Sequence, residues 1–525
     1  MRLTLTSARA SAVLAFTLLT VGDVVMPYAQ TAARWMAAGT LTASNAGEDD
    51  HLGAGNALTG VALQVSRDGR TLAVAAPHED SVARGINGDQ KDDSAFDAGA
   101  VYVFTRNGSD WVQQAYIKAS NAQSGDQFGF AVALSGDGNT LAVGANFEDS
   151  GAAGVNGNQA DESASGAGAV YVFVRNGTTW SQQAYIKSSN VGEGDRFGYS
   201  LALSVDGNTL SAGAIGEDSG STGTSGNQAD DSAQQAGAVY VFTRSGVTWT
   251  QQAYLKASNT QAGDMFGFCV ALSGDGNTLG VCAYDEDSSA EGVDGDQADN
   301  GSNGSGAAYV LVRNGEAWRQ QAYVKASNTV IQGAFGAAIA LSADGNTLAI
   351  CAVDEDGLNP GVDAVQWQAD RKPAERTRVA EDSAGAVYLY ERRGATWSFQ
   401  TYIKSSNIRA NDTFGARLAL SADGSILAAG APQQPGGGTG VNSTTVDASA
   451  PESGAVYVFA RDAGRWRQEA SVKAPDAAEY DQFGSGVALS EDGRVLAAAA
   501  MGADGRDNAT RDAGAVYMFT RSDGR

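Results

Sequence analysis

The sequence predicts an all-β fold, a seven-bladed β-propeller whose blades are four-stranded antiparallel sheets. Three observations carry this prediction. One block of sequence recurs along nearly all of the 525 residues, with a constant spacing in its most regular part (180 − 111 = 69). Seven tryptophans open the blocks: Trp35, Trp111, Trp180, Trp249, Trp318, Trp397 and Trp466. Seven glycines in register begin the closing strand: Gly99, Gly168, Gly237, Gly306, Gly385, Gly454 and Gly514.

Each block holds four strand-like runs, which are clearest at residues 128–134, 140–145, 168–175 and 180–187. A Gly-Asp-Gly-Asn turn joins the first two runs as a hairpin. The third run is apolar on both faces, which predicts a buried strand. The fourth run alternates apolar and polar residues, which suits an exposed edge strand, and its lysines are interpreted as protection of that edge. These lysines are Lys118, Lys187, Lys256, Lys325, Lys404 and Lys473.

Radial stacking explains how such small sheets bury both faces, because one four-stranded sheet alone cannot do so. Small residues on the first two strands, such as Ala131, Ala133 and Gly144, fit the crowded centre of a ring. Aromatic residues on the outer strands, such as Tyr171 and Phe173, fit the wider rim. The structural alternative is a β-solenoid, whose coils are usually shorter than this repeat.

The two ends of the chain predict how the ring closes. The first block starts at Trp35 with the fourth-strand pattern, and the last block stops at Arg521 after its third strand. The last sheet therefore lacks a strand that the N-terminal segment can supply. We expect residues 35–42 to pair antiparallel with residues 515–520 and so complete the last blade.

The first 29 residues are interpreted as an export signal, and residues 30–525 as the propeller. Arg2 and Arg9 precede an apolar run over residues 11–22, and small residues lie near Ala29. The run is too short to span a bilayer. A short membrane anchor and a disordered tail are the alternatives. We expect no membrane span once the signal is removed, and a location outside the cell or on its surface, with the periplasm as the alternative.

Charge and cysteine content limit the possible partners. The chain carries 35 Lys and Arg against 60 Asp and Glu, a formal net charge of −25. Such a surface repels phosphate, which argues against nucleic acid and anionic membranes and favours divalent cations or basic partners. Three cysteines imply no disulfide framework. Cys269 and Cys282 would face each other across a turn, as small core residues or as a bonded pair. A basic insertion at residues 358–377 is either a solvated loop or a partner contact.

A Phe-Gly pair opens the first strand of six blocks, whereas the first block keeps only Gly60. The pairs begin at Phe128, Phe197, Phe266, Phe335, Phe414 and Phe483. A Gly-Ala-Pro-like end of the second strand occurs at residues 430–432 and, less completely, in other blocks. Together these motifs resemble the FG-GAP repeat, the blade of the integrin α-subunit propeller and of its bacterial relatives. The resemblance implies a seven-bladed propeller with an extracellular adhesion or ligand-binding role.

The family's usual calcium loop is not evident in the hairpin between the first two strands. That hairpin reads Ser-Gly-Asp-Gly-Asn-Thr here, with one aspartate, such as Asp137 or Asp275. Calcium needs six to eight oxygen ligands, so these aspartates are interpreted as ordinary turn residues.

Acidic loops between the second and third strands are the most informative feature for function. They start with a Glu-Asp pair (Glu79, Asp80; Glu148, Asp149; Glu217, Asp218; Glu286, Asp287) and continue with an Asn/Asp-rich cluster, which in the third block holds Asn227 and Asp230. Blade topology places them on the same face as the turns that hold Asp126, Asp195 and Asp264. Calcium chelation and simple solvation are the competing interpretations. The candidate calcium ligands are Asn87, Asp89, Asp92, Asn156, Asn158, Asp161, Asp294, Asp296 and Asp299.

Catalysis has little support in the sequence. The chain has two histidines, His51 in a variable loop and His78 where the next block has Phe147. No nucleophile elbow, zinc-protease motif or Cys/His arrangement is present. We therefore expect a non-enzymatic, monomeric binding or adhesion propeller that engages a protein or glycan through its acidic loop face. A carbohydrate-binding or carbohydrate-processing propeller and a structural envelope component are the alternatives.

Overall fold

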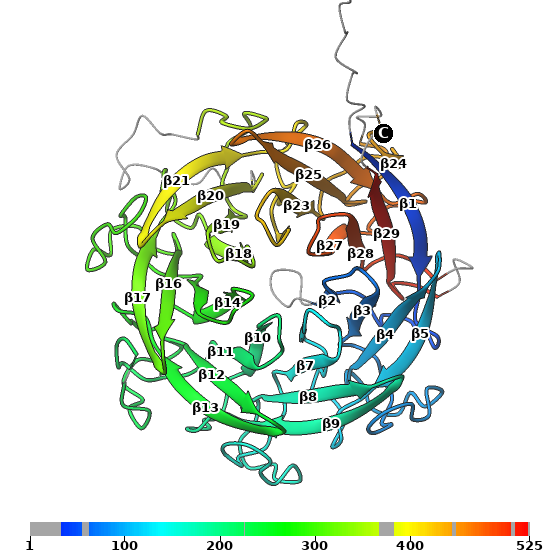
Figure 1. Cartoon of the computed structure of the whole chain (residues 1–525), viewed down its shortest axis with the longest axis vertical. Coiled ribbons are helices and arrows are strands. Elements are labelled where there is room, and N and C mark those ends of the chain that lie inside the picture. Colours follow the sequence, from blue (N-terminus) through cyan, green and yellow to red (C-terminus); the bar gives the residue numbers. More distant parts are fainter. Residues whose placement is uncertain are drawn as a thin grey trace, which may run out of the picture.

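The computed structural model describes residues 33–54, 62–224, 226–366, 383–443, 448–505 and 510–522. These residues form seven antiparallel sheets arranged as blades around a common centre (Figure 1). The predicted all-β, seven-bladed propeller is confirmed. The described residues contain no helix, and hence none with the length and apolar character to cross a membrane. The predicted signal (residues 1–29) and residues 367–377 of the basic insertion lie outside the described residues.

Blades are numbered in chain order, and the strands of each blade follow one another from the centre to the rim. Blade one holds β2 (Leu63–Val65), β3 (Thr71–Ala76), β4 (Ala100–Asn107) and β5 (Asp110–Ile117). Blade two holds β6 (Ala131–Leu134), β7 (Thr140–Ala145), β8 (Ala169–Asn176) and β9 (Thr179–Ile186). Blade three holds β10 (Phe197–Leu203), β11 (Thr209–Ala214), β12 (Ala238–Ser245) and β13 (Thr248–Leu255). Blade four holds β14 (Phe266–Leu272), β15 (Thr278–Ala283), β16 (Ala307–Asn314) and β17 (Ala317–Val324).

The remaining blades keep this order. Blade five holds β18 (Phe335–Leu341), β19 (Thr347–Ala352), β20 (Ala386–Arg393) and β21 (Thr396–Ile403). Blade six holds β22 (Arg417–Leu420), β23 (Ile426–Ala431), β25 (Ala455–Asp462), β26 (Arg465–Lys473) and the short outer strand β24 (Gly440–Val441). Blade seven holds β27 (Phe483–Leu489), β28 (Val495–Ala500), β29 (Ala515–Ser522) and, as its outermost strand, β1 (Arg34–Leu41).

The ring closes through the N-terminal strand, as the two ends of the sequence predict. Strand β1 pairs antiparallel with β29, so that Trp35 lies opposite Arg521 and Leu41 opposite Val516 (Figure 1). Trp35 is buried between blades six and seven, and its indole N–H donates to Glu469 at 2.8 Å. The strand therefore completes the last sheet and also contributes to the core between two blades.

A glycine at the start of each third strand lets neighbouring blades approach closely. Gly168 has a φ of 79°, and a β-carbon there would lie 2.2 Å from the carbonyl oxygen of Phe197 in the next blade. No other residue type fits, because the conformation is left-handed and the space is filled by backbone. Equivalent contacts join the other blades, which explains why this glycine and the Phe-Gly pair recur together.

Leu52 and Gly53 make the contacts of the Phe-Gly pair in blade one. A β-carbon on Gly514 would lie 2.2 Å from the Leu52 nitrogen, and Leu52 is fully buried like the phenylalanines. The Gly53 N–H donates to Ala75 at 2.7 Å, as the Gly129 N–H donates to Gly144 at 2.9 Å. The sequence assignment of this position to Gly60, which lies outside the described residues, missed the leucine substitution and the longer segment before β2.

The interpretation of the repeated lysines as edge protection is wrong. Lys118, Lys187, Lys256, Lys325 and Lys404 have fully buried side chains, each paired with a glutamate of the same blade. The lysines are buried because the acidic loop folds back over the outer strand, where Val155, for example, forms a bridge with Ile186. That loop covers the end of the strand that was expected to be exposed.

The rim is held together by a repeated contact between blades. Gln114 of β5 accepts hydrogen bonds from Arg175 and from the Trp180 indole of the next blade, both at 3.1 Å. The Arg175 guanidinium also lies 5.3 Å from the centre of the Trp180 ring, a cation–π distance. Blades three, four and five repeat this arrangement with the preceding blade.

The three cysteines are free thiols. Cys282 and Cys351 are buried and Cys269 is partly exposed. Cys269 and Cys282, which were expected to face each other, are not bonded, and the expectation of a small core residue holds for Cys282. Burial raises the pKa of the Cys282 and Cys351 thiols well above the ordinary value, which keeps them protonated.

Candidate functional site

The acidic loops and the turns before each Phe-Gly pair lie on one face of the ring, as predicted. Where the loop of blade one meets the turn before Phe128, the Gly125 N–H donates to the Phe96 carbonyl at 2.9 Å, and the Gln127 N–H donates to the Asp97 carbonyl at 3.0 Å. The hairpin turns between the first two strands lie at the opposite ends of the strands. The face with the acidic loops is called the acidic face below.

In blades one, two, four, five and six, the loop after the second strand is fastened to the outer strand of its own blade through one Asn or Asp in a left-handed conformation, which is Asn87, Asn156, Asp294, Asp363 or Asn442. Asn156 has a φ of 57°, its N–H donates to the Tyr185 carbonyl at 2.7 Å, and its side-chain oxygen accepts the Tyr185 N–H at 3.0 Å. Asn87 bonds to Tyr116, and Asp294 to Tyr323, in the same way. Asn and Asp tolerate this conformation better than other side chains, so these three predicted calcium ligands already hold the loop in place.

The other predicted calcium ligands also accept hydrogen bonds from nearby backbone. Asp89, Asn158 and Asp296 each accept the N–H two residues further on, at 3.0 to 3.2 Å. Asp92, Asp161 and Asp299 accept N–H groups of Val82, Ser163 and Ser289 at 2.7 to 3.2 Å. Among the described residues, Asp294, Asp296 and Asp299 do not bring three carboxylate ligand atoms within 4.8 Å of one another. Calcium binding in these loops therefore stays a prediction.

Beneath the loops lies a buried polar network that the sequence analysis missed. In blade two, Glu148 accepts hydrogen bonds from Lys187 at 2.8 Å, from the Tyr185 hydroxyl at 2.6 Å and from the Ser150 N–H at 3.1 Å. Burial lowers the pKa of the Lys187 ammonium, against the opposing effect of Glu148. The sequence does carry a signal for this network, because Glu, Tyr and Lys occur together at fixed positions in five repeats.

The network also crosses from one blade to the next. Asn121, which follows β5 of blade one, donates to Glu148 of blade two at 3.0 Å and accepts from the Tyr171 hydroxyl at 2.5 Å. Asn45, which follows β1, makes the same bonds to Glu79 and Tyr102 of blade one. Glu148 and its equivalents therefore connect the acidic loop, the outer strand and the neighbouring blade, which is a structural role.

Six aspartates in the turns of the acidic face are buried with unusual protonation behaviour. Each accepts a backbone N–H three residues earlier, as Asp195 accepts from Gly192 at 2.7 Å. Burial raises the pKa of Asp126 to about 8 and the pKa values of Asp50, Asp195 and Asp264 to about 7. The pKa values of Asp412 and Asp481 are raised to about 6 for the same reason. These carboxyls change charge near neutral pH and make the acidic face responsive to pH.

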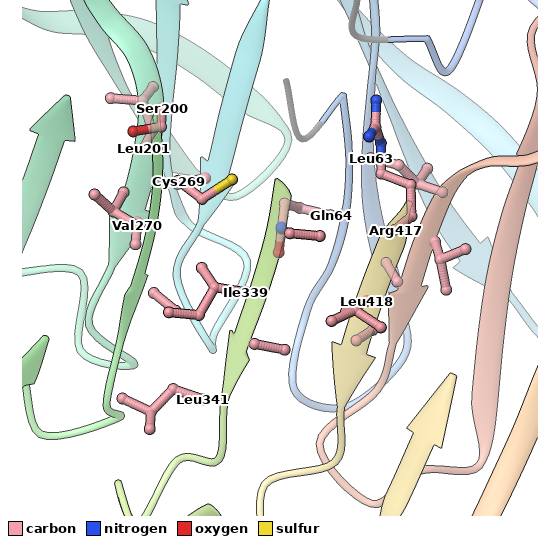
Figure 2. Close-up of a pocket in the computed structure, with 18 of the residues that line it drawn as sticks. Leu63, Gln64, Ser200, Leu201, Cys269, Val270, Ile339, Leu341, Arg417 and Leu418 are labelled. Atoms are coloured by element: carbon pink, nitrogen blue, oxygen red, sulfur yellow. The ribbon is translucent and has the colours of Figure 1, made fainter. Parts of the chain in front are cut away.

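The centre of the ring contains a cavity of about 250 Å³ lined by the first strands of the blades (Figure 2). Its wall is mostly small and aliphatic, with Ile339 and Leu341 labelled on one strand. Gln64, Ser200 and Cys269 add polar groups, and Arg417 is the one charged residue among the described residues that line it. Burial lowers the pKa of the Arg417 guanidinium. The cavity is at the small end for a ligand site.

The hairpin turns at the other end of the first strands form a closed ring of backbone hydrogen bonds. Each turn donates one N–H to the equivalent carbonyl of the next blade, over distances of 2.8 to 3.3 Å. The order of donors is Arg67, Gly136, Val205, Gly274, Ala343, Ala422 and Glu491, and Glu491 donates back to Arg67. This ring fixes the central ends of all seven blades and leaves the acidic face as the variable side of the molecule.

Comparison with known proteins supports the assignment of the repeat. The FG-GAP repeat family matches residues 111–173, 180–242, 249–311 and 466–519. No curated protein matches the chain. A solved β-propeller domain of Cps50 (Swd1) from Myceliophteria thermophila is 8% identical, covers 93% of this chain and 99% of its own, and has a TM-score of 0.46. The periplasmic gluconolactonase PpgL from Pseudomonas aeruginosa is 16% identical, covers 79% and 86%, and has a TM-score of 0.42.

Neither solved structure bears on what this chain binds. The family match covers four of the seven blades, and the glycine contacts between blades extend the same repeat to the others. The chain therefore contains FG-GAP repeats and forms a seven-bladed β-propeller.

Proposed function

We propose that this propeller is an exported, non-enzymatic binding protein that engages a protein or glycan partner through the acidic face. The observation that carries the proposal is the combination of rigidity and charge in the acidic loops. In blades one to four, the described part of each loop is bonded to its outer strand and to the preceding blade, so this part does not have to become ordered when a partner binds. Preorganised surfaces lose less entropy on binding.

Exposed carboxylates give this face a negative charge. Asp93, Glu162 and Asp231 are exposed on the loops of blades one, two and three. A concentration of negative charge on one face favours partners with Lys or Arg side chains and accelerates their association at low salt. Among the described residues, the opposite face has no such loops, because its connections are the turns of the closed backbone ring and the short turns between third and fourth strands.

A matched pair of variants tests the face. The acidic-face variant combines Asp93→Asn, Glu162→Gln and Asp231→Asn. The control combines Asp110→Asn, Glu316→Gln and Asp462→Asn, which removes three exposed carboxylates from the turns between third and fourth strands on the opposite face. Binding of the labelled proteins to cells of the producing organism and to a glycan array is then measured at low and high salt. We expect at least roughly a tenfold loss of affinity for the acidic-face variant, about 1.4 kcal/mol, and none for the control.

The same experiment separates the alternatives. Equal binding by both variants would contradict the use of the acidic face. Release of reducing sugars from a bound glycan would support a carbohydrate-processing enzyme instead. Absence of binding to cells, proteins and glycans would favour a structural envelope component.

Calcium dependence is tested separately in the same assay. Extracellular calcium modules bind in the millimolar range or somewhat more tightly. Affinity that rises in millimolar calcium and falls in chelator would support calcium in the acidic loops. Equal affinity in both conditions would remove calcium from the proposal.

A further inference from the structure

The two histidines of the chain meet at the place where the ring closes. His51 lies in the turn before Leu52, and His78 follows β3 of blade one. Their ring centres are 5.3 Å apart, with an edge-to-face arrangement. No sequence feature predicts this meeting, because residue 51 belongs to the segment that links β1 to blade one.

The turn that holds His51 is bonded to the last blade by three consecutive backbone hydrogen bonds. The N–H groups of Asp49, His51 and Leu52 donate to Arg511, Asp512 and Ala513 at 3.0, 3.1 and 3.0 Å. This ladder holds two segments that are far apart in sequence in a fixed relative position. It places the side chains of Asp49, His51 and Asp512 together.

These three side chains form a group of metal-ligand type. One ligand atom from each of Asp49, His51 and Asp512 lies within 4.8 Å of the other two. Among the described residues no other group of three His, Cys, Asp or Glu side chains meets this criterion. One imidazole with two carboxylates is a donor set that suits zinc and similar divalent transition metals, with water in the fourth position.

His51 and Asp512 are partly buried, whereas Asp49 is exposed to solvent, so an ion can reach the three ligand atoms from outside. His78 is bonded through Nδ1 to Asp97 at 2.8 Å. The exposed Arg511 lies 3.1 Å from Asp49 and 3.5 Å from Asp512, and such surface pairs contribute little.

The corresponding turns of the other blades lack this donor set. The residue at the position of His51, directly before the first residue of each Phe-Gly pair, is Gln127, Arg196, Met265, Ala334, Thr413 or Gln482. Gln127 keeps the same backbone bond, to Asp97 at 3.0 Å. The backbone geometry is therefore common to the repeat, and Asp97 stands at the position of Asp512, whereas the histidine and Asp49 are specific to the closing seam.

We propose that Asp49, His51 and Asp512 bind one divalent transition-metal ion of the zinc type and that this ion fastens the N-terminal segment to the last blade. The proposal does not depend on the acidic-face function. A bound ion connects the turn after β1 with the residues just before β29, which are the two parts that must stay together for the ring to remain closed. An ion that binds the folded and not the unfolded chain stabilises the fold by mass action.

The experiment uses the full chain without a polyhistidine tag, stripped with chelator and dialysed. Zinc binding is followed by calorimetry, cobalt binding by its visible absorption, and ring stability by thermal melting with and without zinc. We expect one ion per chain and a higher melting temperature with zinc. The visible absorption of bound cobalt should be typical of an ion with a low coordination number. His51→Ala and Asp512→Asn should each weaken zinc binding by at least about tenfold, since even residues behind a ligand cost that much.

Gln127→Ala is the matched control, because it changes the same position one blade further on, and it should bind zinc like the unchanged protein. Asp512→Asn keeps the shape of the side chain, so a loss of binding in a variant that melts normally without zinc is not a folding defect. The proposal is overturned if the unchanged protein binds no zinc or does not melt at a higher temperature with it. It is also overturned if His51→Ala binds zinc as tightly as Gln127→Ala.

Discussion

Lys187 donates a hydrogen bond to Glu148 across 2.8 Å, and both side chains are buried beneath an acidic loop. The pair lies at the centre of the network that joins the outer strand, the loop and the neighbouring blade. The same Glu–Lys pair occurs in blades one to five. The acidic loops are therefore part of the core of each blade and not appendages on its surface.

Removing the lysine from this pair should strongly destabilise the ring. Lys187→Met leaves Glu148 buried without its counter-charge, and loss of one partner of a buried pair costs about 3–5 kcal/mol. Adding Glu148→Gln should recover part of this loss, because the uncompensated charge is removed. Urea unfolding measures both, with Lys91→Met on the exposed part of a loop as the control, expected to change stability by less than about 0.5 kcal/mol. Equal effects of Lys187→Met and Lys91→Met would contradict a structural role for the network.

Removal of the N-terminal strand should open the ring. A chain that starts at residue 46 lacks β1 and Asn45, so β29 becomes an unpaired edge and Glu79 and Tyr102 lose a partner. We expect a lower melting temperature and concentration-dependent association, because an exposed edge strand pairs with other chains. The control chain starts at residue 30, after the predicted signal, and should melt like the full chain. A synthetic peptide of residues 33–46 added to the shorter chain should restore the melt, and an unchanged melt without β1 would contradict this closure.

The repeat made the ring and its closure predictable, because every strand pattern can be compared with six others. The partial motif at each end of the chain was enough to pair Trp35 with the last blade. The buried lysines were not predictable from alternation within one strand, since the loop that covers Lys187 comes from residues some 30 positions earlier. Comparison of the repeats does indicate that these residues belong together, because they change together. Blade six has Gln434 at the position of the glutamate and Ser471 at the position of the tyrosine. The last blade has Ala503 at the position of the glutamate and Thr42 at the position of the lysine.

The candidate metal group illustrates a second limit. His51 and Asp512 stand at opposite ends of the chain, and only ring closure brings them together. Both positions recur in the repeat, but the histidine occurs in only one of the repeats, so the pattern that revealed the fold carried no information about this pair. The acidic loops, in contrast, were correctly placed on one face because topology alone decides on which side of a blade a connection lies.

Stability should fall as the pH rises from about 5 to about 8.5. The pKa of Asp126 is raised to about 8, and those of Asp195 and Asp264 to about 7, from an ordinary value of 3.8. Between these values the folded chain binds more protons than the unfolded chain, so the free energy of unfolding decreases with pH. The stabilisation is complete below the unfolded pKa and is lost as the pH passes the folded values.

Asparagine at these positions should flatten the pH dependence. The combination Asp126→Asn, Asp195→Asn and Asp264→Asn keeps an oxygen that accepts the turn N–H and removes the titration. Melting temperatures measured across the pH range should then fall less steeply than in the unchanged protein. The control replaces Asp137, Asp206 and Asp275 of the hairpin turns by Asn, because hydrogen bonds from Ser and Asn side chains outweigh burial and lower the pKa of those carboxyls. A slope that is equally steep in both triple variants would contradict the assignment.

Gly168→Ala should separate neighbouring blades, whereas Gly177→Ala should not. Both glycines have positive φ, 79° and 63°, so alanine carries a similar backbone cost of roughly 1–2 kcal/mol at either position. At Gly177, in the turn between β8 and β9, a β-carbon meets nothing within 4 Å, whereas at Gly168 it would lie 2.2 Å from Phe197 of the next blade. Urea unfolding should therefore show a much larger loss for Gly168→Ala, accompanied by faster hydrogen exchange at the Phe197 amide, which donates to Ala167 at 2.8 Å. Similar losses for the two variants would mean that backbone conformation alone, and not the approach of the blades, requires the glycine that begins every third strand.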